Sequence, residues 1–272
     1  MFLLENQLPF FILKDIFSLV EIAKSIGEDD GKLAVVKLTQ KFTKNCWGFL
    51  GVDESLCGTE HFGRVKHLVD FLRICMLCPN FPKYYRRPKV LTIPSATRLN
   101  QAGVVFKLGK NSNLFDITFK DGILEIPKIE VRGSTEIVLK NLMAFEQSQL
   151  KENEISDYVI LMFYLVNTSQ DVELLAHNAI IENRIGDSKV VANLFRNLSG
   201  CSSFGAKSFI FAELFEDLNA FSQTPWRMWM GTLRRDCFNS AWGNTVSVIV
   251  ACALFILTFV QTICSIVPLF QK

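Results

Sequence analysis

Histidine is scarce in this chain, which has three in 272 residues: His61, His67 and His177. So few imidazoles leave little material for a metal centre or a histidine-dependent catalytic site. Net charge is small as well, because 29 basic residues almost balance 27 acidic ones. A net charge of +2 creates no overall field that attracts polyanions, so we expect no nucleic-acid partner.

Catalytic and nucleotide-binding motifs are missing too. The sequence holds no P-loop, no G-x-G-x-x-G and no H-E-x-x-H, and "GCSSFG" at residues 200–205 lacks the spacing of a nucleophile elbow. Glu125 and Glu130 could lie near one another, but nothing in their spacing singles out a general acid and base. We therefore expect no enzyme, no catalytic residues and no cofactor.

The eight cysteines are scattered rather than paired along the chain. Cys75 and Cys78 form one C-x-x-C at the end of a helical pattern. A zinc site would need a second pair or well-placed histidines, for which His61 and His67 are the nearby candidates. We interpret the pair as small apolar residues on a helix face and predict no metal site.

Charge is absent from the C-terminal stretch, because no charged residue occurs from Cys237 to Gln271. This stretch contributes much of the positive mean hydropathy, +0.24. Roughly 20 helical residues cross the hydrocarbon core of a bilayer, and residues 246–267 are long enough. We predict a transmembrane helix at residues 245–267; the alternative is a buried core helix.

The charges that flank this segment predict its orientation. Arg227, Arg234 and Arg235 precede it, whereas Lys272 alone follows it. Positive charge favours the cytosolic side, so the large N-terminal domain should be cytosolic and the sequons at residues 167–169 and 197–199 should stay unglycosylated. Trp226, Trp229 and Trp242 precede the span, where indoles favour the interface. The N-terminus lacks the basic region of a signal peptide.

The chain opens with "LLENQLPFFILKDIF" at residues 3–17, a helical pattern that is apolar over most of its circumference. We expect Leu8, Phe11 and Ile12 to pack on later helices, with Leu13, Phe17 or Val20 more exposed. Further helices are predicted at residues 32–49 and 62–78. The proline-rich "PNFPKYYRRPKV" at residues 79–90 excludes a continuous helix and is typical of a solvated linker; the alternative is that its basic residues form a nucleic-acid or anionic-lipid patch.

The spacing of apolar residues then changes from a helical to a strand-like pattern. Residues 104–108, 114–119 and 123–126 favour short strands, and Asp121-Gly122 is a tight-turn signal, so we predict a small antiparallel sheet. Helices follow: one capped by Asp171, with an apolar stripe over residues 172–180, a second with a stripe over residues 190–198, and a third over residues 207–221. The predicted fold is mainly α with a small antiparallel β-sheet (α+β): a globular domain at 1–236 with its sheet near 104–126, then the membrane helix.

Five motifs, in this order, resemble the plant family called domain of unknown function 247: "LLENQLPFF" (3–11), "IPSATRLNQAGVVFK" (93–107), "LFDITFKDGILEIP" (114–127), "NLMAFEQ" (141–147) and "LTFVQTICSIV" (257–267). The resemblance implies a mostly helical globular region and one C-terminal transmembrane segment. It carries over no catalytic residues. Some grass members are associated with self-incompatibility, which suggests recognition rather than catalysis.

The resemblance has two departures. Family members usually carry a longer segment before the first motif, so this chain is expected to be N-terminally truncated. Its "FNSAWG" at residues 238–243 keeps Trp242 but loses the proline that usually precedes it. We expect a single-pass, membrane-anchored plant protein that acts in recognition or scaffolding through protein partners. The alternatives are a membrane-tethered enzyme with an unrecognised site and a truncated paralogue with little function.

Overall fold

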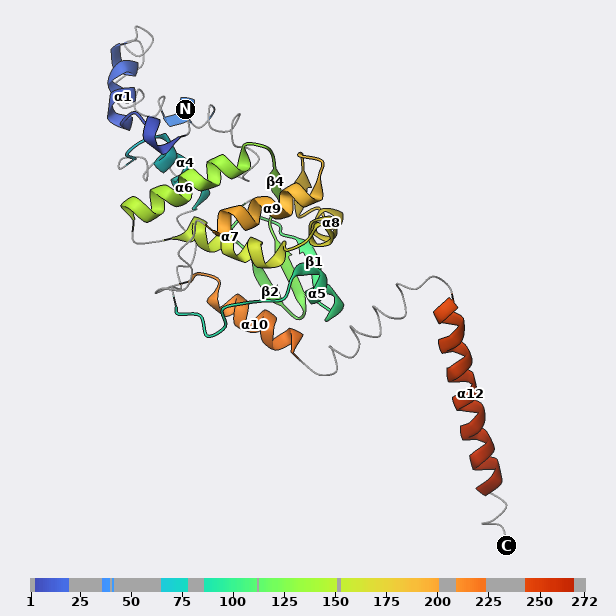
Figure 1. The fold of residues 1–272 in the computed structure, drawn as a ribbon. Helices are drawn as coiled ribbons and strands as arrows, with labels where there is room; N and C mark the ends of the chain where they lie inside the picture. The colour runs from blue at the N-terminus through green and yellow to red at the C-terminus, as the bar shows by residue number, and fades with distance from the viewer. Residues whose placement is uncertain are drawn as a thin grey trace.

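The computed structural model is mainly helical, with two small sheets beside the helices (Figure 1). It describes residues 3–19, 36–39, 41, 65–77, 86–111, 113–150, 153–200, 209–223 and 243–266. The elements, in chain order, are η1 (Leu4–Asn6), α1 (Phe10–Leu19), α4 (Leu68–Met76), α5 (Ala96–Gln101), β1 (Val105–Leu108), β2 (Thr118–Lys120), β3 (Ile123–Ile126), β4 (Ile129–Val131), α6 (Thr135–Gln149), α7 (Glu154–Leu165), α8 (Ser169–His177), β5 (Ile181–Asn183), α9 (Ser188–Ser199), α10 (Ala212–Ser222) and α12 (Gly243–Ile266).

The three predicted strands form one sheet, but the sheet is mixed rather than antiparallel. Its order is β1-β3-β2: β2 pairs antiparallel with β3 through the predicted Asp121-Gly122 turn, whereas β1 pairs parallel with β3. The prediction of an all-antiparallel sheet was wrong because the chain does not turn straight back after β1. Leu114 and Phe115, both buried, anchor the connection in the core and bring β2 to the far side of β3.

The turn itself follows the chemistry that the sequence predicts. Asp121 and Gly122 both have positive φ values, 52° and 80°, as the tight turn of a two-residue hairpin requires. A Cβ at Gly122 would also come within 2.9 Å of the Phe221 ring. Backbone conformation and packing therefore both favour glycine at this position.

A second sheet, which the sequence did not predict, pairs β4 parallel with β5. Residues 132–180 lie between these strands and contain α6, α7 and α8, so two three-residue strands close a long helical crossover. The main-chain amide of Ile129 donates to the Ile180 carbonyl (2.8 Å), and that of Arg184 donates to the Val131 carbonyl (2.9 Å).

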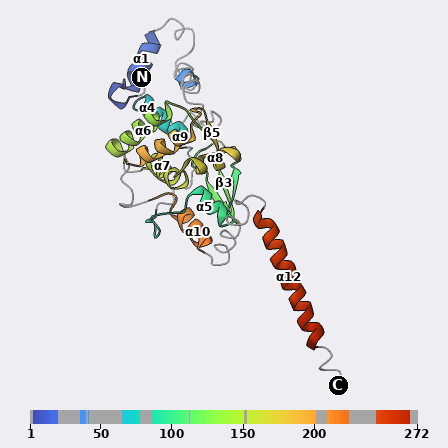
Figure 2. The same ribbon diagram turned by 45° about the vertical axis from the view of Figure 1, so that its right-hand side comes forward.

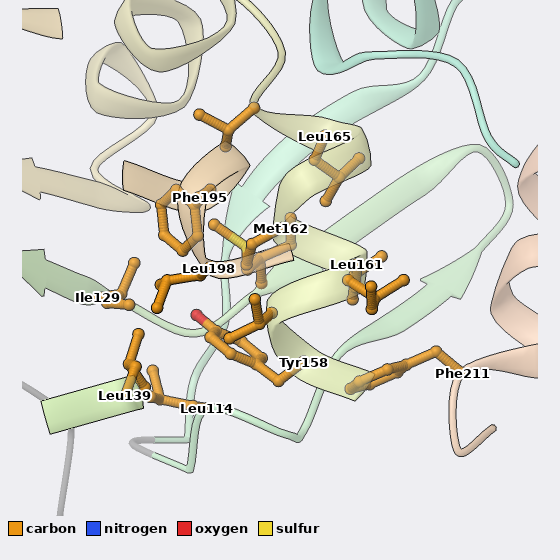
Figure 3. Close-up of a cluster of buried hydrophobic side chains, with 14 of the residues drawn as sticks. Leu114, Ile129, Leu139, Tyr158, Leu161, Met162, Leu165, Phe195, Leu198 and Phe211 are labelled. Atoms are coloured by element: carbon orange, nitrogen blue, oxygen red, sulfur yellow. The ribbon is translucent and has the colours of Figure 1, made fainter. Parts of the chain in front are cut away.

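The core is organised around α7, which is buried along nearly its whole length. Side chains from α6, α9, β4 and the segment before β2 surround it, among them Leu139, Leu198 and Ile129 (Figure 3). Tyr158 of α7 is 1% exposed, and its hydroxyl, which points into this apolar cluster, has no hydrogen-bond partner among the described residues.

The first helix packs with a different face from the one predicted. Phe10 is fully buried against Phe71 of α4, with Leu13 and Phe17 partly buried beside it. Phe11 and Leu8, which we expected to be buried, are 63% and 55% exposed. A helix that is apolar over most of its circumference has no single face that periodicity selects. Its rotation is set by contacts such as the hydrogen bond from the Phe10 amide to the Lys66 carbonyl (2.7 Å).

The helix predicted to start at Asp171 starts earlier. Thr168 is the N-cap of α8, and Asp171 completes a capping box with it as the third helical residue. The predicted stripe also runs too far, because α8 ends at His177 and Ala179 has a φ of 59° before the chain enters β5. The stripe of α9 is confirmed except at Val190, which is 45% exposed.

The C-terminal helix α12 stands apart from the other elements in both views (Figures 1 and 2), and its side chains from residue 249 to residue 262 are all exposed. Among the side chains that the structure describes, no single helix has both the length and the apolar character needed to cross a membrane. Helices α7 and α8 meet that criterion together, but they are bent by 103° relative to one another. The span at 245–267 therefore stays a prediction.

Candidate functional site

The residues that the sequence nominated for metal chemistry do not come together. Cys75 is buried in the small cluster that holds Phe10 and Phe71, while Cys78 and His61 lie outside the described residues. His67 is the N-cap of α4: its Nδ1 accepts a hydrogen bond from the Asp70 amide (3.2 Å). Burial, which exceeds the opposing effect of Asp70, lowers the pKa of His67.

Within the described parts of the chain, no three His, Cys, Asp or Glu side chains lie close enough to hold a metal ion. His177 is exposed at the end of α8. In the segment "GCSSFG", which lacks the spacing of a nucleophile elbow, Gly200 follows α9. Residues 201–205 lie outside the residues that the structure describes.

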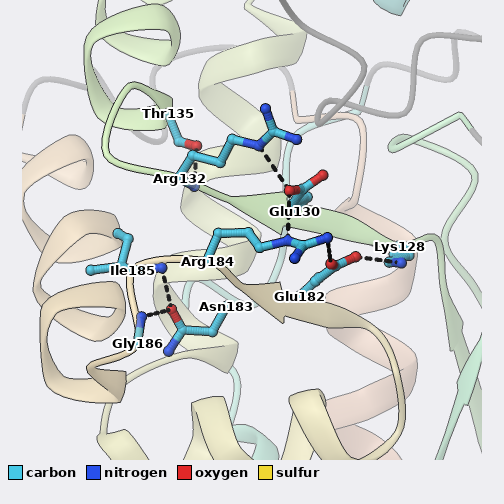
Figure 4. Close-up of polar contacts among 9 residues, drawn as sticks. All are labelled: Lys128, Glu130, Arg132, Thr135, Glu182, Asn183, Arg184, Ile185 and Gly186. Carbon is cyan, nitrogen blue, oxygen red and sulfur yellow. Dashed lines mark hydrogen bonds and ion pairs between the residues drawn. The ribbon is translucent and has the colours of Figure 1, made fainter.

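The two carboxylates considered near the sheet belong to different sheets. Glu125 lies on β3, opposite Lys107 of β1, whereas Glu130 lies on β4. Glu130 accepts hydrogen bonds from Arg132 (2.8 Å) and Arg184 (2.9 Å), and these bonds, that from Arg132 above all, lower its pKa. Figure 4 shows that Glu182 continues this network to Lys128, so the group is an ion-pair ladder over β4 and β5 rather than an acid–base pair.

The basic segment at residues 79–90 is in part tied to the body. Arg86 forms a β-bridge with Phe209, and its guanidinium pairs with Glu216 of α10 at 2.9 Å. The main-chain amide of Lys89 donates to the same carboxylate (3.3 Å). Residues 78–85, including Lys83 and the two tyrosines, lie outside the described residues, as do Trp226, Trp229 and Trp242.

A buried ionic cluster is the strongest candidate site, and the sequence reasoning missed it. Arg73 of α4 lies between two carboxylates: its Nε is 3.3 Å from Oε1 of Glu146 on α6, and a terminal nitrogen is 2.6 Å from Oε2 of Glu154 on α7. Glu146 and Glu154 are 0% exposed and Arg73 is 8% exposed. The cluster therefore fastens three helices to one another away from solvent.

Glu146 also caps α7 from outside that helix. Asn153, the N-cap residue, makes no side-chain cap bond. Instead the Glu146 carboxylate accepts the main-chain amides of Ile155 (3.0 Å) and Ser156 (3.2 Å). The first amides of a helix have no hydrogen-bond partner within the helix. A negative charge near them interacts favourably with the positive end of the helix dipole.

Asp157, one turn further along α7, extends the cluster to a fourth segment. Its Oδ2 accepts the main-chain amide of Ile210 (2.9 Å), just before α10. This bond joins α7 to the residues that pair with Arg86 through Phe209. One carboxylate thus fixes the entry of α10 against the central helix.

The electrostatics of this site are unbalanced, because Arg73 pairs with Glu146 and Glu154 while the third buried carboxylate, Asp157, accepts a main-chain amide. Burial raises the pKa of Glu146 to about 7, and the nearby Glu154 adds to the increase while Arg73 and the amides oppose it. Burial, with the charges of Glu146 and Glu154, raises the pKa of Asp157 to about 8. Burial therefore favours the protonated forms of Glu146 and Asp157 relative to free carboxyl groups.

A sequence signal for this cluster does exist. Glu154 and Asp157 are three residues apart, hence on one face of a helix that is otherwise apolar, and a buried acidic face requires a partner. Arg73 likewise interrupts the apolar run of α4. Periodicity alone does not show that these two interruptions meet.

Outside the ionic cluster, the carboxylate of Asp171 joins α5 to α8. Asp171 accepts the main-chain amide of Thr97 at the start of α5 (2.8 Å) through one oxygen, and through the other the amide and hydroxyl of Thr168 (both 2.8 Å) at the start of α8. Burial alone would raise the pKa of Asp171, but these hydrogen bonds outweigh it and lower the pKa.

Comparison with known proteins places the chain among plant proteins. The model of DUF247, described as a plant protein of unknown function, matches residues 1–257. The chain belongs to this family. It is 26% identical over 266 residues to UPF0481 protein At3g47200 of Arabidopsis thaliana, a match that covers 88% of this chain and 54% of that protein. It is 28% identical over 146 residues to Putative UPF0481 protein At3g02645 of the same plant, covering 53% of this chain and 27% of that protein.

The chain thus spans about half the length of At3g47200. No solved structure gives a significant match to it.

In this DUF247 protein, polar residues of the motifs that carry the family resemblance bond residues of other elements. The Leu4 amide of the first motif donates to Asn141 of "NLMAFEQ" (2.6 Å), and Gln7 accepts the amide of Val69 (3.3 Å). Glu146 of "NLMAFEQ" accepts the main-chain amide of Ile155 at the start of α7. The main-chain amide of Thr97, in "IPSATRLNQAGVVFK", donates to the Asp171 carboxylate. The polar residues of these motifs therefore join helices.

Proposed function

We propose that this DUF247 protein is a single-pass, membrane-anchored protein whose helical body acts in recognition or scaffolding on the cytosolic face, without enzymatic activity. The observation that carries the proposal is the C-terminal helix. Its 14 side chains from Ile249 to Thr262 are exposed and none is charged; six are leucine, isoleucine or valine and two are phenylalanine. Exposed apolar surface of this extent is costly in water and favourable in lipid.

The sequence on both sides supports an anchor. Uncharged residues continue from position 237 to position 271, and the 24 residues of α12 would extend about 36 Å at 1.5 Å per residue. The hydroxyl of Thr258 donates to the main-chain carbonyl of Leu254 (2.9 Å), and that of Thr262 donates to the carbonyl of Thr258 (2.8 Å). These bonds satisfy polar groups that lipid could not pair.

The contacts of the buried ionic cluster are those of a structural rather than a catalytic group. Its carboxylates accept main-chain amides and pair with Arg73, and none of the four residues is more than 8% exposed. A general acid or base must reach a substrate proton at hydrogen-bonding distance. These groups are instead committed to joining helices.

Topology can be measured with the chain's own sequons. Asn167 and Asn197 are both exposed in the structure. The full chain, carrying an added sequon in a short C-terminal tail, is expressed in a plant cell, and its membranes are extracted with alkaline carbonate and treated with a glycosidase. We expect the chain to stay in the membrane pellet, with sugar on the tail alone. Release by carbonate would refute the anchor, and sugar at Asn167 or Asn197 would refute the cytosolic orientation.

A further inference from the structure

We propose that the free edge of β1 accepts an extended acidic and apolar segment of a partner protein as an added strand. The inference deepens the proposed recognition function, on which it rests, by assigning a partner class. The strand order β1-β3-β2 places β1 at an edge of its sheet, and Figure 1 shows it at the margin of the helical body. An edge strand presents a row of main-chain groups that a further strand can pair with.

The register shows which groups face outward. The Val105 amide donates to the Gly122 carbonyl (2.9 Å) and the Gly109 amide to the Ile126 carbonyl (2.8 Å), so the odd-numbered residues of β1 direct their main-chain groups to β3. Phe106 and Leu108 therefore direct theirs away from β3. Neither residue has a main-chain hydrogen bond on that side to any residue in the described ranges.

The residues of β1 differ in exposure. Phe106 is 4% exposed and belongs to the hydrophobic core. Leu108 is 43% exposed and Val105 is 51% exposed, so the strand keeps accessible apolar surface beside unpaired amides and carbonyls. An added strand would pair these groups and cover both side chains.

The side chains of β1 define the partner's chemistry. Val105 and Lys107 lie on one face of the sheet, opposite Ile123 and Glu125 of β3. An acidic residue opposite Lys107 would be favourable, because it would continue an alternation of charge across the sheet. An apolar residue would be favourable opposite Val105. Leu108, on the other face, favours another apolar residue. The fitting segment alternates an acidic side chain with apolar ones.

The same edge disfavours a second copy of this chain. Antiparallel pairing that uses the outward groups of both Phe106 and Leu108 places Lys107 directly opposite Lys107 of the other copy, and like charges in that position are destabilising. Pairing Phe106 with Phe106 of the copy avoids this but leaves half of the outward groups unused. Charge complementarity therefore favours a different, acidic partner.

The experiment selects octapeptides from a randomised display library against the full chain in lipid nanodiscs and measures their binding by fluorescence anisotropy. We expect peptides that alternate an acidic residue with apolar ones, and we expect peptide binding to slow hydrogen exchange at the amides of Phe106 and Leu108. Leu108→Pro removes an outward donor without removing a bond to β3, and proline is tolerated at such edge positions. Leu108→Ala keeps that donor and is the matched control.

The proposal requires that Leu108→Pro weaken binding about tenfold more than Leu108→Ala does, because both variants lose the leucine side chain and only the first loses the donor. Lys107→Glu should shift the selected peptides from acidic to basic. Unchanged exchange at Lys107 and Gly109 shows that the β1–β3 ladder survives in each variant. Recovery of no peptide, equal binding by Leu108→Pro and Leu108→Ala, or unchanged charge preference in Lys107→Glu would each overturn the inference. None of these results bears on the membrane anchor, which the carbonate and glycosidase assays measure separately.

Discussion

Replacing Asp157 with asparagine should stabilise the protein at neutral pH and weaken the dependence of its stability on pH. The pKa of Asp157 is raised from 3.8 to about 8, chiefly by burial. Between these values the unfolded chain releases a proton that the folded chain retains. Stability due to this group is therefore fully present below pH 3.8 and is lost as pH rises towards 8.

The magnitude follows from the same linkage. One group with a raised pKa costs about 1.4 kcal/mol of stability per pH unit within its window. Asp157 alone then removes up to roughly 4 kcal/mol between pH 4 and pH 7. Glu146, whose pKa is raised to about 7, adds a second contribution of the same sign, so the wild-type slope between pH 5 and pH 7 is roughly 2.4 kcal/mol per unit.

Asparagine removes the titration but keeps the structure. Its side-chain oxygen can still accept the Ile210 amide, which now donates to Oδ2 of Asp157 at 2.9 Å. The slope of Asp157→Asn between pH 5 and pH 7 should therefore be about half that of the wild type, and the variant should be more stable at pH 7 by up to roughly 4 kcal/mol. Asp157→Ala leaves that amide unpaired and should lose about 1–3 kcal/mol relative to Asp157→Asn.

The assay is urea unfolding of the full chain in nanodiscs, followed by circular dichroism from pH 5 to pH 9. Glu213→Gln, which removes an exposed carboxylate on α10, controls for the loss of one negative charge. Comparing variants at each pH cancels the titration of groups that they share, such as Asp171. If Asp157→Asn keeps the wild-type slope, Asp157 is already ionised in the folded protein and the reasoning is wrong.

Three further substitutions test individual contacts by the same unfolding measurement. Arg73→Met leaves Glu146 and Glu154 without their shared cation and should cost about 3–5 kcal/mol, with a smaller loss at pH 5 than at pH 8; a pH-independent loss would contradict an electrostatic origin. Tyr158→Phe removes a buried hydroxyl with no partner among the described residues and should be neutral or stabilising by about 1 kcal/mol, whereas a loss above that would indicate a bound water or another partner. Asp171→Ala removes acceptors at the starts of both α5 and α8 and should cost about 2–4 kcal/mol; a loss no greater than that of Thr168→Ala would show that the bond to Thr97 adds nothing.

Features that depend on neighbouring residues could be predicted from the sequence. The Asp121-Gly122 turn requires positive φ values, and only a few residue types adopt them readily, so the β2–β3 hairpin was predictable. The apolar stripe of α9 was predictable because one face of that helix is polar. In both cases local chemistry excludes the alternatives.

Features that depend on distant pairing could not be predicted in this way. The parallel β1–β3 ladder depends on how the buried Leu114 and Phe115 anchor the connection to β2, and no local signal distinguishes that route from a simple meander. The rotation of α1 was ambiguous because both candidate faces are apolar, and the position of Phe10 is set by α4. In the ionic cluster, Arg73 is separated from Glu146 by 73 positions in the sequence and from Glu154 by 81. The charged residues could be seen in the sequence, but their contact could not be predicted from it.

The cap that Glu146 provides has a consequence for how the chain folds. A helix with its own N-cap can begin to form as an isolated segment, but α7 obtains its cap from the end of α6 and its charge partner from α4. The cap and the charge partner of the central helix are therefore complete only when both neighbours have docked. We expect a fragment that contains α7 without α4 and α6 to have less helix at these residues than the whole protein.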